Sequence, residues 1–340
     1  MAGEKTGQNE NTFLRPLAGS WMDFFHWPAE GTYFSDTLRT FTESQWRAKV
    51  REMASLGMTY IVLTGTAIVR PGREEAYFRT DLFPFPEDYV CKDPIGAVLD
   101  EADRQGMKVF VSCGWFGNMQ RPWENMQSEE VTRKAFRAME QLYALYGSHP
   151  SFFGWYLPDE TAIRETFEPF FVAYVNRYAD FAKTLFPAGR MLIAPYGTKT
   201  VRVSDGFLRQ LDALRCDIIA YQDEVGVRKA SPDEAASAFA ALKQMHDKVG
   251  KARLWADLEL FDFEGEVYRS ALIPADIGRL ERQMRALDPF AEELLCYCYP
   301  GIFNLPGTPA FCGRPDSDLA GAGYAALIGK RIPDENRLAF

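Results

Sequence analysis

The feature that most constrains the fold is an alternation, repeated eight times along the chain, of a short apolar run and a longer amphipathic segment. The runs are rich in β-branched and aromatic residues, which is typical of strands buried on both faces of a parallel sheet. They lie at residues 20–27, 58–69, 107–113, 151–156, 190–196, 216–223, 251–261 and 293–299. Eight strand–helix units in 340 residues predict an α/β fold, a single (β/α)₈ TIM barrel.

The segments between these runs carry the signals of helices. Apolar residues recur at helical spacing, polar capping residues stand at several starts, and glycine often follows the end. Pro94 and Pro232 each fall in the first turn of an expected helix, where proline's missing N–H costs no hydrogen bond. We expect helices at residues 42–56, 93–105, 128–146, 168–186, 204–215, 231–250, 274–287 and 320–329. A long loop is expected at residues 70–89, and such loops usually bind ligands or act as lids.

No linker divides the chain, so we expect one barrel domain at residues 15–340 behind a flexible tail at residues 1–14. The alternative fold is a doubly wound open sheet, which usually carries a glycine-rich phosphate turn. Neither G-x-G-x-x-G nor G-x-x-x-x-G-K-S/T occurs in the sequence. The polar start lacks the apolar core of a signal peptide, which indicates a cytoplasmic chain by default and leaves open an exported chain whose signal was trimmed.

Composition excludes several kinds of partner. The formal net charge of −9 argues against nucleic acid, which calls for a basic surface. No apolar run approaches the roughly 18 residues that a membrane span needs. The six cysteines form no C-x-x-C pair, and in a chain of this length we interpret them as small buried apolar residues rather than a disulfide framework. The oligomeric state is not indicated by the sequence.

Acidic and aromatic residues gather at the ends of the expected strands, where a parallel barrel keeps its active site. The candidates, in chain order, are Asp23, His26, Trp115, Asp159, Glu160, Tyr196, Tyr221, Gln222, Asp223, Asp257, Glu259 and Tyr297. With three histidines in the chain, a multi-histidine metal centre is not expected. The absence of a G-x-S-x-G elbow argues against a serine triad.

Two carboxyl groups facing each other across a barrel mouth suit the hydrolysis of glycosides. One group protonates the leaving oxygen, and the other attacks the anomeric carbon or activates water. Glu160 follows the fourth apolar run and Glu259 lies in the seventh, so we expect them to face each other over a bound sugar. This chemistry requires no cofactor. Trp115, Tyr196, Trp255 and Tyr297 are candidate platforms on which a sugar ring stacks.

The stretch HPSFFGWYLPDE at residues 149–160 resembles the H-P-x-x-x-G-W-x-x-x-N-E motif of retaining TIM-barrel glycosidases of clan A. The resemblance implies that Glu160 is the acid/base and that Glu259, in WADLE, is the nucleophile. G-W-Y-x-P-x-E and QDEVG at residues 222–226 are similar to a group of bacterial glycosidase-like barrels that have no assigned function. The resemblance also implies that Tyr221 is the tyrosine that bonds to the nucleophile.

One position departs from the clan. Asp159 stands where the clan usually has asparagine, whose amide contacts the sugar 2-hydroxyl. A carboxylate there accepts from the hydroxyl, and its charge is expected to raise the pKa of Glu160. Asp159, Tyr221, Gln222, Asp223, Asp257 and Asp23 are the expected supporting residues.

Two alternatives belong to other functional classes. The first is a barrel that binds carbohydrate without catalysis, because fold alone does not imply activity. An accessible pocket lined by both carboxyl groups would argue for the enzyme. The second is a carboxylate–metal enzyme, such as a sugar isomerase, with a divalent ion held by Asp159, Glu160, Asp223 and Glu259. A convergent cluster of these oxygens would argue for the metal enzyme.

Overall fold

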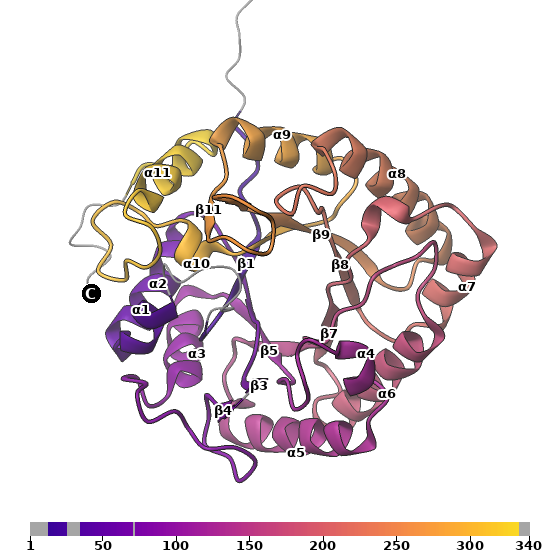
Figure 1. The fold of residues 1–340 in the computed structure, drawn as a ribbon, viewed down its shortest axis with the longest axis horizontal. Helices are drawn as coiled ribbons and strands as arrows, with labels where there is room; N and C mark the ends of the chain where they lie inside the picture. The colour runs from indigo at the N-terminus through magenta and orange to yellow at the C-terminus, as the bar shows by residue number, and fades with distance from the viewer. Residues whose placement is uncertain (1–12, 26–34, 71, 333–340) are drawn as a thin grey trace, which may run out of the picture.

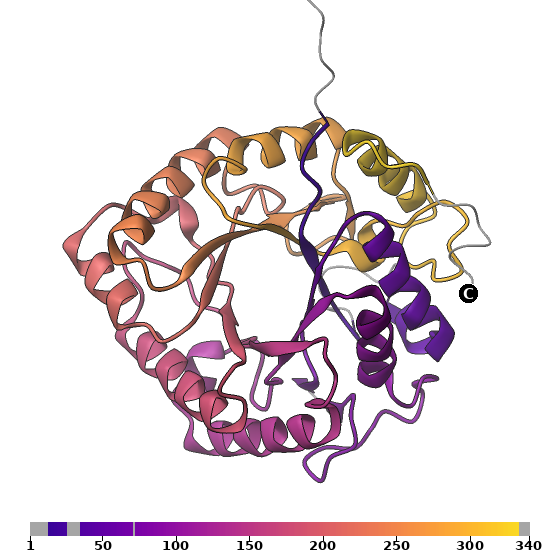
Figure 2. The ribbon, with the colours of Figure 1, turned by 180° about the vertical axis from the view of Figure 1, so that it is seen from behind.

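Eight parallel strands close into a barrel in the computed structural model, which describes residues 13–25, 35–70 and 72–332. The strands follow one another round the ring in chain order, and the helices form an outer layer (Figures 1 and 2). The barrel strands are β1 (Gly19–Met22), β2 (Tyr60–Leu63), β5 (Lys108–Ser112), β6 (Phe152–Tyr156), β7 (Arg190–Ile193), β8 (Ile218–Gln222), β9 (Arg253–Glu259) and β12 (Leu294–Tyr297). This confirms the predicted (β/α)₈ barrel.

Closure of the ring depends on β1, which pairs in parallel with both β2 and β12. Gly19 stands opposite Tyr60 on one side and Leu295 on the other. A Cβ on Gly19 would lie 2.4 Å from the carbonyl oxygen of Tyr60, so this close approach requires glycine. The first expected strand began one residue later and ran to residue 27, but residues 26 and 27 lie outside the described part of the chain.

All eight expected helices are present, with ends shifted by a few residues. They are α2 (Glu43–Ser55), α3 (Pro94–Gln105), α5 (Glu129–Tyr146), α6 (Pro169–Leu185), α7 (Asp205–Ala213), α8 (Pro232–Val249), α9 (Ile277–Leu287) and α11 (Ser317–Leu327). Local chemistry accounts for their starts: Thr42 and Ser231 form capping boxes, and the Asp93 side chain accepts a hydrogen bond from the Gly96 N–H. None of the described helices is both long and apolar enough to cross a membrane.

Two expected strands each break into two, because the chain leaves the barrel at the mouth and pairs again outside it. The run at residues 58–69 forms β2 and then β3 (Ala67–Arg70), and the run at residues 251–261 forms β9 and enters β10 (Phe261–Phe263). Each outer strand makes an antiparallel hairpin, β3 with β4 (Arg73–Ala76) and β10 with β11 (Leu272–Pro274). The first hairpin therefore occupies the start of the expected loop at residues 70–89.

Four further short elements were not expected, because pieces of three to six residues carry no measurable periodicity. They are α1 (Ser35–Thr40), α4 (Pro122–Asn125), the 3₁₀ turn η2 (Thr198–Thr200) and α10 (Tyr299–Ile302).

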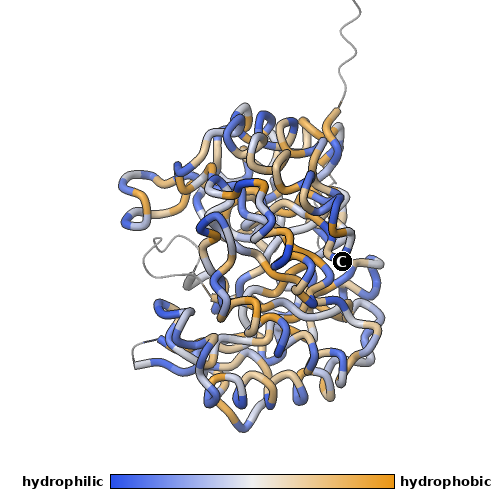
Figure 3. The backbone as a smooth tube through the Cα atoms, turned by 90° about the vertical axis from the view of Figure 1, so that its right-hand side faces the viewer, coloured by the Kyte–Doolittle hydropathy of each residue, from blue (hydrophilic) through white to orange (hydrophobic). Residues whose placement is uncertain are grey.

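Apolar side chains fill the inside of the barrel and the layer between strands and helices. Trp255 packs inside the barrel against Tyr60, with ring centroids 4.8 Å apart, and edge-on against Phe110. All six cysteines are buried, as the sequence predicts. Seen from the side, hydrophobic stretches run through the middle of the molecule and hydrophilic ones are frequent at its outer turns (Figure 3).

A buried ion pair joins α2 to the chain that follows β12. The Lys49 ammonium lies 2.9 Å from Glu52 and donates to Asn304 at 2.8 Å, and both charged side chains are fully buried. Glu52 accepts three further hydrogen bonds, each of 2.6 Å, from the Tyr299 hydroxyl, the Leu305 N–H and the Thr308 hydroxyl. The carboxylate thus gathers one helix and the C-terminal segment around a single desolvated charge.

Lys49→Met should lower the free energy of unfolding by about 3 kcal/mol, because it leaves the Glu52 charge buried without its cation. Urea denaturation at pH 7 measures the change. Lys243→Met is the matched control, since it removes a lysine whose ion pair with Asp247 is exposed and should cost less than about 1 kcal/mol. Equal effects of the two substitutions would contradict a structural role for the buried pair.

Candidate active site

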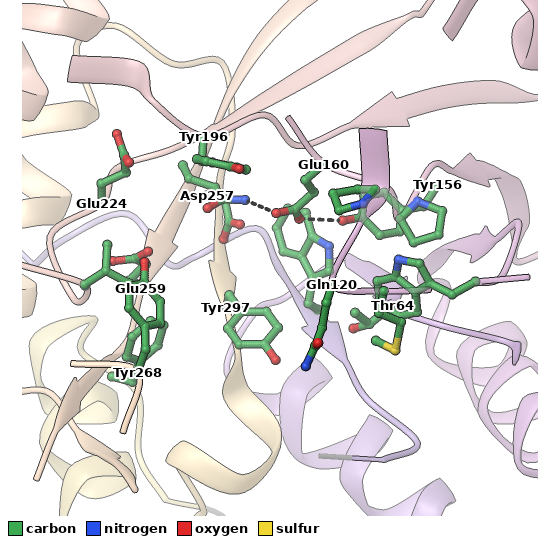
Figure 4. Close-up of a pocket in the computed structure, with 18 of the residues that line it drawn as sticks. Thr64, Gln120, Tyr156, Glu160, Tyr196, Glu224, Asp257, Glu259, Tyr268 and Tyr297 are labelled. Atoms are coloured by element: carbon green, nitrogen blue, oxygen red, sulfur yellow. Dashed lines mark hydrogen bonds between the residues drawn. The ribbon is translucent and has the colours of Figure 1, made fainter. Parts of the chain in front are cut away.

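A cavity of about 460 Å³ lies at the C-terminal ends of the barrel strands, and all eight strands or the loops after them contribute to its wall (Figure 4). Its lining is Trp21, Thr64, Trp115, Met119, Gln120, Pro122, Trp123, Tyr156, Pro158, Glu160, Tyr196, Gln222, Glu224, Val227, Lys229, Asp257, Glu259, Phe261, Tyr268 and Tyr297. Both Glu160 and Glu259 therefore face one accessible cavity.

The Glu160 carboxyl group is held by two neighbours. The Tyr156 hydroxyl donates to Oε1 at 3.0 Å, and the Gln222 amide donates to Oε2 at 2.8 Å (Figure 4). Burial raises the pKa of Glu160 to about 7, and the bonds from Gln222 and Tyr156 act in the opposite direction. Burial, rather than the predicted effect of the Asp159 charge, is thus the main cause. A carboxyl group with this pKa exchanges its proton readily near neutral pH.

Two acids of β9 point into the cavity because alternate residues of a strand share a face. Glu259 is buried and accepts a 2.7 Å hydrogen bond from the Val227 N–H to Oε2. Burial, and then the charge of Asp223, hold the pKa of Glu259 well above its usual range. Asp257 lies deeper, and its Oδ1 has no hydrogen-bond partner among the described residues. Burial, and then the charges of Glu160, Glu259 and Asp223, raise the pKa of Asp257.

The loop after β8 reaches Glu259 by a close approach of two backbones. A Cβ on Gly226 would lie 2.6 Å from the Phe261 carbonyl oxygen and 2.8 Å from the Glu259 Cβ. Glycine at this position therefore lets the next residue, Val227, bring its N–H to the carboxylate. This is a physical reason for the glycine that ends the QDEVG stretch.

Asp223 supports Glu259 from behind the cavity and does not line it. Its Oδ1 accepts from the N–H groups of Val225 and Glu259, both at 3.2 Å, and its Oδ2 accepts from the Gln283 amide at 2.6 Å. Burial raises the pKa of Asp223 to about 6. Because Asp223 is buried and does not line the cavity, this geometry does not favour the predicted contact with substrate.

Asp159 also turns away from the cavity, in contrast to the expected contact with a sugar hydroxyl. Its Oδ1 accepts a 3.0 Å hydrogen bond from the Asn125 amide, which also donates to the Asn118 carbonyl at 3.0 Å. Asp159 thus anchors the segment that connects β5 to α5. Burial raises the pKa of Asp159 to about 7, with a smaller contribution from the Glu160 charge.

Two other expected site residues lie elsewhere. Tyr221 precedes the inward-facing Gln222, so strand alternation points it outward, where its hydroxyl lies 3.0 Å from His246 Nε2 and its ring packs on Phe239 of α8. The predicted bond from Tyr221 to Glu259 is therefore wrong. Trp255 shares the inward face with Asp257 and Glu259 but lies below them in the barrel core.

The remaining candidates lie on the cavity or directly behind it. Gln222, Trp115, Tyr196 and Tyr297 line it together with Glu160, Asp257 and Glu259. Asp23 is buried behind Tyr297, whose hydroxyl donates to Asp23 Oδ2 at 2.9 Å. His26 lies outside the described residues.

Several residues that line the cavity come from loops, and the sequence did not predict them as site residues. Among the described residues that line the cavity, Lys229 is the one with a positive charge. Its ammonium lies 3.6 Å from the Glu224 carboxylate. It also lies over the rings of Tyr196 and Tyr268, 5.4 and 5.7 Å from their centroids. No periodic pattern marks such positions. Tyr156 could have been found, because it ends β6 four residues before Glu160.

The four carboxylates of the predicted metal site do not converge. Glu160 and Glu259 line the cavity, whereas Asp159 and Asp223 do not and bond instead to Asn125 and Gln283. The described part of the chain holds no group of three or more His, Cys, Asp or Glu side chains placed to bind a metal ion. The expected ligand set for a metal-dependent isomerase is therefore not assembled.

Asp159→Asn should stabilise the protein above pH 7 and leave its stability unchanged near pH 3. The folded protein raises the pKa of Asp159 from 3.8 to about 7, so the folded state binds this proton more tightly and stability falls as pH rises between these values. Asparagine stays neutral and still accepts from Asn125, so the gain at pH 8 should approach about 4 kcal/mol. Urea denaturation at pH 3, 5 and 8 measures it.

Asp212, whose ion pair with Lys251 is exposed, provides the control. Asp212→Asn should show no such pH-dependent gain in the free energy of unfolding. A gain from Asp159→Asn that is the same at every pH would contradict the buried-charge explanation.

Solved structures with the same architecture include several glycosidases. A protein from Bacteroides thetaiotaomicron VPI-5482 that carries a provisional assignment as an α-L-fucosidase matches with a TM-score of 0.72 and 16% identity, over 97% of this chain and 99% of its own. The endo-β-1,4-mannanase of Thermotoga petrophila matches with a TM-score of 0.56 and 11% identity, over 94% and 78%. The endo-1,4-β-mannanase of Rhizomucor miehei matches with 0.54 and 12%, over 94% and 96%. At these identities the likeness establishes the fold.

Two comparisons of the sequence were also informative. No curated protein matches the chain. A family model described as a domain of unknown function, DUF4434, matches residues 17–310, which is nearly the whole barrel.

Proposed function

Because the chain belongs to the DUF4434 family, whose description states no activity, we propose its function from the site: it is a glycoside hydrolase that uses Glu160 and Glu259. The observation that carries the proposal is that these two carboxyl groups, one just after β6 and the other at the end of β9, line one accessible cavity of about 460 Å³. Acids with raised pKa values that share one cavity are typical of catalytic sites, which favours an enzyme over a barrel that only binds sugar. The glycosidases among the structural neighbours favour a carbohydrate substrate.

In the proposed mechanism Glu160 is the acid/base. Its pKa of about 7 leaves it protonated in much of the enzyme at neutral pH, ready to donate to the glycosidic oxygen. The bonds from Tyr156 and Gln222 orient the carboxyl group, so little reorganisation is needed when the proton moves. After the leaving group departs, the ionised Glu160 takes a proton from the water that completes hydrolysis.

Glu259 is the proposed nucleophile. The Val227 N–H bonds to Oε2 and favours the ionised form against the effect of burial, while Asp223 bonds to the Glu259 N–H and steadies the end of β9. The ionised carboxylate attacks the anomeric carbon and forms a covalent glycosyl intermediate with retained configuration after the second step. This outcome requires the two carboxyl groups to come within about 5 to 5.5 Å in the substrate complex. Trp115, Tyr196 and Tyr297 are proposed to contact the sugar.

Substitution of either acid should lower the rate of hydrolysis of aryl glycosides, and the two substitutions should differ in how the loss depends on the leaving group. Glu160→Gln should lower kcat/KM by about 10² to 10⁴ for 4-nitrophenyl glycosides and much less for 2,4-dinitrophenyl glycosides, which leave without a proton. Glu259→Gln should lower it strongly for both. A screen of aryl glycosides and oligosaccharides, with the product anomer followed by NMR, measures these effects.

Glu124→Gln is the control, because Glu124 is an exposed acid of α4 that does not line the cavity. Full activity of Glu160→Gln on 4-nitrophenyl glycosides would remove the central claim. A product of inverted configuration would contradict the role of Glu259 as nucleophile. It would indicate instead that a general base activates water for direct attack on the sugar.

The activity should fall as pH rises through about 7, because Glu160 must be protonated to act as the acid. Gln222→Met should move this alkaline limb to higher pH, since the Gln222 amide stabilises the ionised form and its loss raises the pKa of Glu160. The pH dependence of kcat/KM reports the shift in the free enzyme. If the alkaline limb of kcat/KM moves to lower pH in Gln222→Met, or persists in Glu160→Gln, then the limb reports the titration of a group other than Glu160.

A further inference from the structure

The wall of the cavity has a charged part and an uncharged part. The charged lining residues, Glu160, Glu224, Lys229, Asp257 and Glu259, all come from β6, β8, β9 and the loops after them. Among the described residues, the lining from β2 and from the segment between β5 and α5 carries no charge: Thr64, Trp115, Met119, Gln120, Pro122 and Trp123. In Figure 4, Glu224 and Glu259 lie at one end, Thr64 and Tyr156 at the other, and Glu160 and Asp257 between them.

The order of the strands gives this division a direction. Going round the barrel from β9, which carries Glu259, one passes β8 and β7 to reach β6, after which Glu160 follows; the next strand is β5. In the proposed mechanism the sugar under attack lies against Glu259, and the bond to its leaving group lies at Glu160. The leaving group therefore extends past Glu160, toward the uncharged segment after β5.

That segment presents an aromatic ring to the leaving group. Trp123, on the short helix α4, lines the cavity and is 51% exposed, an unusual exposure for the largest apolar side chain. The exposed Gln120 lines the same cavity and supplies an amide that donates and accepts hydrogen bonds. A flat ring with an apolar face and hydroxyls at its edge fits this pairing, and a sugar ring has both features.

The segment is held in place before any ligand arrives. The Asn125 amide bonds to the Asn118 carbonyl and to Asp159 Oδ1, each at 3.0 Å, which ties both ends of the turn around Trp123 to the residue next to Glu160. The Arg121 N–H donates to the Asn118 carbonyl at 2.9 Å and the Met126 N–H to the Pro122 carbonyl at 3.0 Å. An ordered platform binds without a large loss of conformational entropy.

We propose that the segment from Trp115 to Trp123 is a leaving-group subsite that takes a second sugar ring, with Trp123 as its platform, so that the substrate is a disaccharide or longer saccharide. The subsite rests on the proposed function, because the roles of Glu259 and Glu160 decide on which side of the cavity the leaving group lies. It assigns to Asp159 the task of positioning this segment, in place of a contact with the sugar under attack.

Trp123→Ala should lower kcat/KM about tenfold for a disaccharide and change it less than about twofold for the glycosyl fluoride of the same sugar, whose leaving group has no ring. Trp123→Phe should restore much of the loss. The exposed Phe311, which does not line the cavity, provides the matched control as Phe311→Ala. Equal losses on both substrates, or no loss on the disaccharide, would overturn the subsite.

A binding measurement separates this proposal from the catalytic one. The Kd of Glu160→Gln for β-1,4-mannobiose, cellobiose and lactose is measured by NMR titration, with and without Trp123→Ala. If adding Trp123→Ala raises the Kd for the best-bound disaccharide roughly tenfold, the subsite is supported. This holds even if the wild type hydrolyses no saccharide, because a lack of hydrolysis would refute the proposed function alone. An unchanged Kd, or no binding by any of the three, overturns the subsite, and hydrolysis that is independent of Trp123 leaves the proposed function standing.

Discussion

The structure depends on the closure of a parallel ring in which every strand hydrogen-bonds to two others. Closure brings the C-terminal ends of eight strands round one opening, so residues 274 positions apart, Asp23 and Tyr297, become hydrogen-bonded neighbours. It also decides which side chains enter the cavity, because the strand period of two sends alternate residues inward. Asp257 and Glu259 face the cavity for this reason, whereas Tyr221 faces α8.

Desolvation gives the cavity its chemistry. Burial is the main cause of the raised pKa values of Glu160, Asp257 and Glu259. Neighbouring donors then separate their roles. Hydrogen bonds from Tyr156 and Gln222 keep the pKa of Glu160 from rising above about 7. The Val227 N–H bonds to the Glu259 carboxylate, and Asp257 Oδ1 has no hydrogen-bond partner among the described residues. The two acids that do not line the cavity, Asp159 and Asp223, bond to Asn125 and Gln283 and act on the scaffold.

Much of the fold was predictable because its signals are local or strictly periodic. The apolar runs and the helix caps marked the strands and the long helices, and Gly57, Gly106 and Gly250 marked helix ends. The hairpins β3–β4 and β10–β11 were not predicted, because β3 and β10 lie close behind barrel strands and were included in the same runs. Pairing partners outside the barrel are long-range information that a single run does not contain.

The sequence by itself determined the barrel, the position of Glu160 and Glu259 at the C-terminal ends of their strands, and a site rich in acids and aromatic rings. Tertiary structure decided which acids reach the cavity, since Asp159 and Glu160 are adjacent in the chain yet face Asn125 and the cavity respectively. It also brought in Lys229, Tyr268 and Trp123 from loops. The physical reason is that strand residues take their direction from a fixed period, whereas loop residues take theirs from contacts with distant parts of the chain.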